Sequence, residues 1–269
     1  SDVYKRQTLG LPKLDHNHVQ MLARQFSPVI IQDISAPYDR FGKIRWRKNR
    51  VVIDASEPAV YFYISYGFLN GRSALQLNYT VWYAERAGEG TPWIEKGPLD
   101  GLTYRVTLNE MGKPVMSDIM NNCGCYYFFV PKKEHIRKIV KKPGELEPLI
   151  PAWMPEEFPK KRAQLRVNSV WHQVQKITTD LIPSAHTEYE LIPYDTLESL
   201  PKETGRHESV FTSEGIMKDS WRIEPYLFFS MGVSKVGYMR QRGHHAIKLV
   251  GREHFTNPHL FDNNFLFKP

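Results

Sequence analysis

The residues with the most specific chemistry are the two cysteines of the segment Asn-Asn-Cys-Gly-Cys-Tyr at 121–126, where one predicted strand ends and another begins. On a regular strand, residues two apart point to the same side about 6.6 Å apart. Two thiolates on one zinc ion lie only about 3.8 Å apart. Gly124 is free to adopt unusual backbone angles, so a bulge or turn there could bring the sulfurs together. Three interpretations stay open: two structural thiols, a disulfide or redox-active pair, and a metal site completed by histidines.

Ten histidines are available as partners. His244 and His245 precede a predicted strand at 246–250, where adjacent side chains point to opposite faces, so the two would not normally bind one metal ion. We expect one of them to face a cleft with Arg242 or Arg252 while the other packs inside; a surface or core role is the alternative for every histidine. The metal or redox hypothesis names these residues, with a divalent metal as its cofactor: Cys123, Cys125, His244, His245 and His254.

Other catalytic signatures are absent from the sequence. There is no Gly-x-Ser-x-Gly segment, no Gly-rich phosphate loop and no dinucleotide-binding motif. Six carboxylates are candidates for acid–base chemistry, but their spacing pairs none of them: Asp54, Asp100, Asp118, Glu188, Glu190 and Glu224. Whether the protein is an enzyme stays open.

Alternating strands must position these residues. In the segment 74–83 every second residue, from Leu75 to Tyr83, is a large apolar or aromatic one, and Gln76, Asn78, Thr80 and Trp82 share the other face. After an aromatic strand at 60–66 and an Asn-Gly turn, this pattern predicts a hairpin with one buried and one more polar face. A second hairpin is predicted over 102–120, a short helix over 15–25 with Asp15 as its N-cap, and strands at 126–130, 187–192, 226–230 and 246–250.

Composition restricts the class of protein. The 269 residues are 41% hydrophobic and 13% aromatic, which excludes disordered, collagen-like and coiled-coil chains. The longest charge-free stretches, 58–71 and 73–84, are too short for a membrane-spanning helix. A net charge of +7 permits an anionic partner, but no nucleic-acid-binding motif is present, which disfavours nucleic acid. We expect an α+β, β-rich fold: an antiparallel two-sheet sandwich with short peripheral helices.

The chain divides at two places. Residues 1–7 look like a translated sequencing-adapter string, so we expect them not to belong to the fold and the native N-terminus to be missing. Residues 131–166 are rich in lysine, arginine and proline. This stretch could link two domains, but the strand pattern resumes after it, so we expect one β-rich domain over 8–269 with a basic, Pro-rich excursion at 131–166.

Several segments together resemble an uncharacterised bacterial protein family: the strands 75–83 and 99–108, the Cys-Gly-Cys-Tyr segment, and the stretch 239–255. In that family the Cys-Gly-Cys-Tyr segment is often flanked by histidines, where this sequence has Asn121 and Tyr127. The strand order is also similar to the β-sandwich group of necrosis-inducing and vacuolar-sorting-associated proteins. The acidic metal-binding motif of that group is missing here, and Leu-Asp-Gly-Leu-Thr-Tyr stands at 99–104 in its place.

Three functions remain as hypotheses, and we favour a periplasmic or secreted location. The first is a ligand-binding cell-envelope protein for a small molecule or glycan, with aromatic residues on a concave face and arginines nearby. The second is a metal- or thiol-dependent enzyme, and the third binds an anionic surface or nucleic acid through 132–166. The ligand-binding residues of the first are Trp82, Tyr104, Tyr126, Trp171, Arg242 and Arg252.

Overall fold

The computed structural model describes residues 14–143, 147–180, 186–227, 232–248 and 253–268. Strands dominate this part of the chain and helices are few and short, which confirms the β-rich class. The expected adapter segment at 1–7 lies outside the described residues. Among those residues, no helix has the length and apolar character that crossing a membrane requires.

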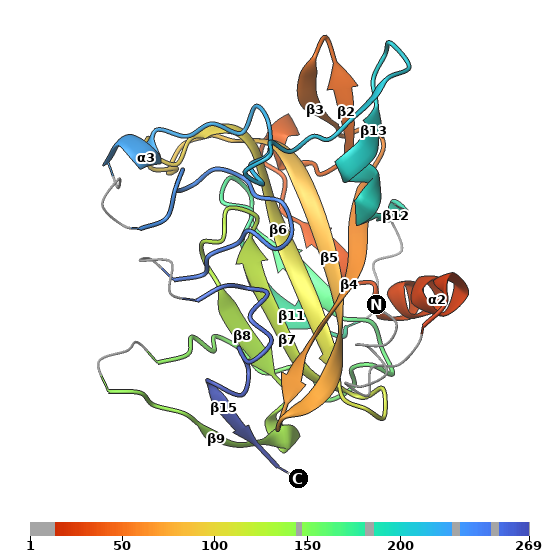
Figure 1. The fold of residues 1–269 in the computed structure, drawn as a ribbon, viewed down its shortest axis with the longest axis vertical. Helices are drawn as coiled ribbons and strands as arrows, with labels where there is room; N and C mark the ends of the chain where they lie inside the picture. The colour runs from red at the N-terminus through yellow and green to blue at the C-terminus, as the bar shows by residue number, and fades with distance from the viewer. Residues whose placement is uncertain (1–13, 144–146, 181–185, 228–231, 249–252, 269) are drawn as a thin grey trace.

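Six strands form the central sheet in the order β12-β4-β5-β6-β7-β8 (Figure 1). The two predicted hairpins form its centre, paired antiparallel. At one edge β12 pairs in parallel with β4, so the expectation of purely antiparallel pairing is wrong there. In chain order the strands are β4 (Ala59–Leu69), β5 (Arg72–Arg86), β6 (Gly97–Leu108), β7 (Pro114–Asn121), β8 (Phe128–Pro131) and β12 (Glu190–Pro193).

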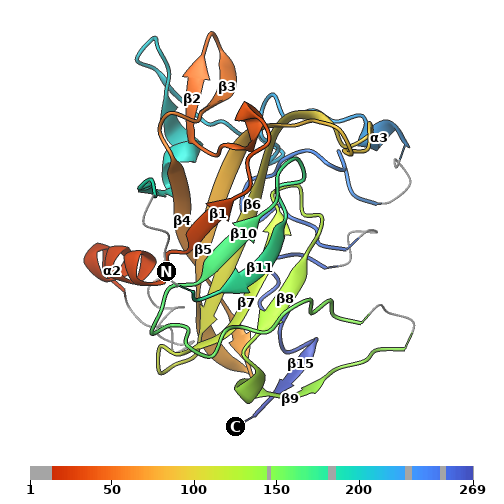
Figure 2. The ribbon, with the colours of Figure 1, turned by 180° about the vertical axis from the view of Figure 1, so that it is seen from behind.

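A three-stranded sheet covers one face of the central sheet (Figure 2). It consists of β1 (Val29–Gln32), β10 (Gln164–Val167) and β11 (Val174–Thr178), with β1 and β10 parallel. Helix α2 (His16–Phe26) packs beside it and begins as predicted, since the Asp15 carboxylate accepts the His18 N–H at 2.9 Å. The apolar face expected on β5 lies in the core that these elements enclose: Leu75, Leu77, Tyr79, Val81 and Tyr83.

The opposite face of the central sheet carries the polar side chains that the alternation predicts along β5, and they are buried. Arg105 shows how: its Nε donates to Asp118 Oδ1 at 2.8 Å and its Nη1 to the Phe255 carbonyl at 2.7 Å. The Phe255 ring centroid lies 3.6 Å from the same guanidinium. The polar side chains of the sheet therefore bind one another and the C-terminal segment that covers them.

Smaller elements surround these layers. The hairpin of β2 (Lys43–Arg47) and β3 (Arg50–Asp54) projects from one end of the sheet (Figures 1 and 2). The others are β9 (Ile136–Ile139) with β15 (Phe265–Phe267), β13 (Leu200–Pro201) with β14 (His207–Glu208), the 3-10 turns η1 (Pro37–Asp39), η2 (Lys133–His135) and η3 (Tyr194–Ser199), and helix α3 (Glu224–Leu227).

Two predicted strands take other forms. Residues 224–227 form α3 where a strand at 226–230 was expected, and residues 228–231 lie outside the described part of the chain. In the expected strand at 246–250, Ala246 makes an isolated bridge to His254, and 249–252 are not described. The excursion at 131–166 contributes Met154 and Phe158 to the main core.

Candidate functional site

The Cys-Gly-Cys segment forms a tight turn between β7 and β8. The Gly124 N–H donates to the Asn121 carbonyl at 2.7 Å, and the Asn121 N–H donates to the Cys125 carbonyl at 3.0 Å. Gly124 has a φ of +94°, and a Cβ there would overlap the Ala246 carbonyl oxygen. Both the conformation and the close approach therefore require glycine, as the sequence predicts for a turn at this position.

Both cysteines are free thiols. The Cys125 main-chain N–H donates to the Cys123 sulfur at 3.4 Å. The hydrogen bond from Cys125, together with the charge of Arg86, lowers the pKa of Cys123. The same contact and burial raise the pKa of Cys125. Cys123 is therefore the sulfur that ionises first, and Cys125 keeps its proton.

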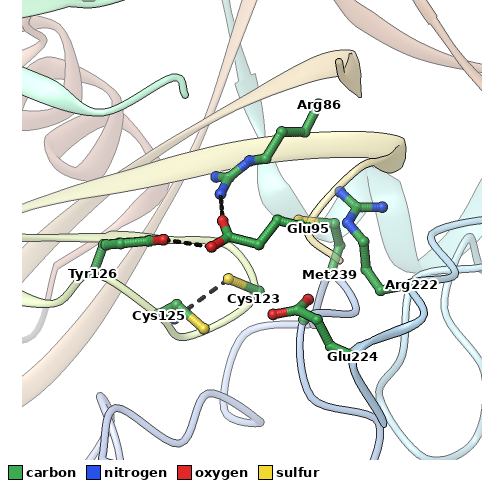
Figure 3. Close-up of a pocket in the computed structure, with 9 residues that line it drawn as sticks. Arg86, Glu95, Cys123, Cys125, Tyr126, Arg222, Glu224 and Met239 are labelled. Atoms are coloured by element: carbon green, nitrogen blue, oxygen red, sulfur yellow. Dashed lines mark hydrogen bonds and ion pairs between the residues drawn. The ribbon is translucent and has the colours of Figure 1, made fainter. Parts of the chain in front are cut away.

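The thiols line a pocket of about 70 Å³ (Figure 3). Five segments form its wall: the end of β5, the loop before β6, the turn after β7, the chain at the start of α3, and residues 237–239. Besides the cysteines, its lining is Arg86, Glu95, Tyr126, Arg222, Glu224, Gly237 and Met239.

Arg86 is the main cation beside the thiols and is only 3% exposed. Its Nε donates to Asp100 Oδ2 at 3.0 Å and its Nη1 to Glu95 Oε2 at 2.7 Å. The Tyr126 hydroxyl donates to the other Glu95 oxygen at 2.8 Å. The guanidinium fork is thus fixed from two sides, which holds its positive charge close to Cys123.

Behind Arg86 lies a fully buried chain of two carboxylates joined by a histidine. His172 Nδ1 lies 2.8 Å from Asp100 Oδ2, and its Nε2 lies 3.1 Å from Asp39 Oδ1. The imidazole stacks on Tyr83 with 3.9 Å between ring centroids. Burial alone would raise the pKa of Asp100, but Arg86 and then His172 hold it well below its usual range. Asp100 therefore stays ionised and anchors Arg86.

Glu224 is the pocket carboxyl whose pKa is raised most clearly. Burial, reinforced by the nearby Glu95 carboxylate, raises its pKa to about 7. Its carboxyl fits against Gly237, where a Cβ would overlap it and φ is +79°. A carboxyl that can take or release a proton near neutral pH thus lies beside two thiols.

No family model, curated protein or solved structure matches this chain. The functional interpretation therefore rests on the side chains of the pocket.

The predicted histidines do not line this pocket. His245 is buried against the Phe255 ring, and burial with the Arg240 charge lowers its pKa to about 3. His244 packs on Gly215, and His254 is exposed. Among the described residues, no three His, Cys, Asp or Glu side chains form a group that could hold a metal ion.

The predicted ligand-binding residues separate into different places. Trp82 and Tyr104 are buried in different cores on opposite faces of the central sheet, so they cannot line one concave face. Tyr126 and Trp171 do meet, edge to face at 6.4 Å between centroids, and Tyr126 lines the thiol pocket. Arg242 pairs with Asp195 and Glu198 away from this pocket, whereas Arg252 lies outside the described residues.

Asp100 and Glu224 are two of the six candidate carboxylates in the sequence, and nothing in their spacing distinguishes them from the other four. Four further residues of the site were not predicted from the sequence: Arg86, Glu95, Arg222 and His172. One weak signal was present: Arg86 ends a long, largely uncharged strand. A charged residue there needs a buried partner, and the chain fold decides which one.

Proposed function

We propose that this protein is a thiol-dependent redox enzyme whose Cys123 and Cys125 cycle between a dithiol and an intramolecular disulfide. The observation that carries the proposal is the turn that joins the two cysteines, in which the Cys125 main-chain N–H donates to the Cys123 sulfur at 3.4 Å beside the fixed charge of Arg86. A stabilised thiolate next to a second, protonated thiol is the arrangement that thiol–disulfide exchange requires.

The reaction proceeds in two exchanges. The Cys123 thiolate attacks one sulfur of a substrate disulfide, and the other substrate sulfur leaves as a thiolate. Cys125 then gives its proton to the ionised Glu224 carboxylate and attacks Cys123, which expels the second substrate sulfur. The two cysteines lose two electrons and the two substrate sulfurs gain them. The two protons lost by the cysteines end on the substrate thiolates, one by way of Glu224 and one through solvent.

Matched serine variants and glutathione disulfide test this proposal. In the wild-type protein, mass spectrometry after alkylation should find an intramolecular disulfide. Cys125→Ser should accumulate a glutathione adduct on Cys123, because the second exchange is missing. Cys123→Ser should react far more slowly, because the remaining thiol is protonated. Equal reaction rates of the two variants, or a wild-type protein that stays fully reduced, would contradict the proposal.

The other two hypotheses receive less support. The aromatic ligand face depends on Trp82 and Tyr104, which are buried in separate cores. In the basic excursion, Lys141 pairs with Glu147 at 2.6 Å and Lys161 with Glu157 at 2.6 Å, so nearby acids offset part of its charge. We also interpret the central sheet and the three-stranded sheet, which share one apolar core, as a β-sandwich.

A further inference from the structure

A second site involves the projecting hairpin of β2 and β3. Its turn residues, Lys48 and Asn49, have φ values of 49° and 62°, which is the two-residue hairpin geometry in which the flanking pair, Arg47 and Arg50, is hydrogen-bonded. Hydrogen-bonded and non-hydrogen-bonded residue pairs alternate along the two strands. The main-chain N–H and C=O groups of Arg50, Val52 and Asp54 therefore point to β2, and those of Val51 and Ile53 point away from it.

Two observed bonds agree with this alternation. The outward N–H of Val51 donates to Asp219 Oδ2 at 2.8 Å, and on β2 the outward N–H of Ile44 donates to the Tyr61 hydroxyl at 2.8 Å. Three outward groups of β3 remain: the Val51 carbonyl and both main-chain groups of Ile53. Within the described residues these three have no hydrogen-bond partner. Figures 1 and 2 show β3 as the outer strand of the hairpin. Such an edge is a template for another strand.

This edge belongs to a groove of about 320 Å³. All four residues 50–53 of β3 form one wall, and Ala84, Pro98 and Leu99 of β5 and β6 give it an apolar lining. Trp221 also lines the groove and is 58% exposed. The Arg50 side chain has no hydrogen bond or ion pair to any described residue. The groove thus combines free main-chain groups, apolar surface and the unpaired charge of Arg50, and its acidic residue, Asp219, is bound to the Val51 N–H.

We propose that this groove binds an extended polypeptide segment, which pairs with β3 as a third strand of the β2–β3 hairpin. A peptide main chain supplies a donor for the Val51 carbonyl and both a donor and an acceptor for Ile53 at the spacing of a strand. Alternate side chains of the bound segment point to the apolar lining, where an apolar residue packs against Trp221. An acidic residue of the segment pairs with Arg50. The site does not depend on the thiol chemistry.

The experiment uses heptapeptides from a random displayed library, selected on the full protein and counter-selected on Ala84→Trp, which fills the groove. Lys176→Trp is the matched control, because it places a tryptophan on an exposed position of β11, away from the groove. We expect selected peptides to bind the wild-type, the control and the two cysteine variants alike, and to lose binding to Ala84→Trp. Arg50→Gln should weaken peptides that carry an acidic residue.

N-methylation of a selected peptide tests the strand pairing. Methyl groups on the alternate amides that face β3 should each reduce affinity about tenfold or more, and those on the intervening amides should have little effect. Three outcomes would overturn the proposal: no peptide distinguishes the wild-type from Ala84→Trp, every N-methyl position is tolerated equally, or hexanoate binds the groove and no peptide does. Loss of redox activity in the cysteine variants with unchanged peptide binding separates this site from the proposed function.

Discussion

The imidazole of His172 and the carboxylate of Asp100 meet at 2.8 Å, with both side chains completely buried. The same carboxylate accepts a hydrogen bond from Arg86, so one buried anion connects the histidine to the guanidinium at the thiol pocket. The second ring nitrogen of His172 faces Asp39 at 3.1 Å. Arg86, and with it the charge beside Cys123, is therefore held in place from deep inside the fold.

Replacing His172 should destabilise the protein strongly. His172→Leu leaves two buried carboxylates without a shared partner, which costs about 3–5 kcal/mol. His16→Leu, at an exposed position of α2, should stay within about 0.5 kcal/mol of the wild-type. Urea unfolding measures both. If the two variants are equally stable, the buried chain of charges does not contribute as described.

Replacing Gly112 and Gly124 by alanine distinguishes the cost of a positive φ from the cost of a steric overlap, because both glycines have a positive φ and only Gly124 is crowded. Gly112 has a φ of +71° with open space around it, whereas Gly124 has a φ of +94° and the Ala246 carbonyl against it. We expect Gly112→Ala to cost about 1 kcal/mol and Gly124→Ala clearly more. Only Gly124→Ala should also slow closure of the Cys123–Cys125 disulfide, measured by quenched alkylation. Equal rates of closure in both variants would show that the turn does not set the thiol geometry.

The Glu224 carboxyl makes stability depend on pH. Its pKa rises from the ordinary 4.5 to about 7 on folding, so the folded state holds this proton more tightly than the unfolded state. The stabilisation that this proton gives the folded state is complete below about pH 4.5, and it is lost as the pH rises through about 7. At 1.36 kcal/mol per pKa unit, this loss is at most about 3 kcal/mol, because water screens part of the interaction of this carboxyl.

Glu224→Gln should remove this part of the pH dependence. Urea unfolding of the wild-type and the variant at several values between about pH 5 and about pH 8 measures the difference, with the larger decline expected in the wild-type. Parallel stability curves for the two proteins would rule out the assigned proton.

The buried pair of Arg105 and Asp118 should respond differently to single and double replacement. Asp118→Leu alone leaves the guanidinium without its carboxylate and should cost about 3–5 kcal/mol. Arg105→Met with Asp118→Leu removes both charges and should cost less than the two single changes added together. A double-mutant cycle from denaturant unfolding gives the coupling, and strict additivity would argue against a direct interaction.

The sequence alone determined several of the local elements. Alternation from Leu75 to Tyr83 identified β5 and its buried face, and Asp15 identified the start of α2. Gly124 between two cysteines indicated a turn, since only glycine adopts such angles freely. These features depend on residues close in the chain, so their spacing is enough to predict them.

Tertiary structure alone decided what surrounds the two cysteines and which face each aromatic residue occupies. Tyr104 pairs with Tyr79 across β5 and β6, and paired residues point to the same face of a sheet. Tyr104 therefore lies on the opposite face from Trp82. Glu224 lies in the same pocket as Cys123, about a hundred residues away in the chain. Pairing register and long-range contacts depend on how whole elements pack, and the spacing of residues along the chain carries little information about either.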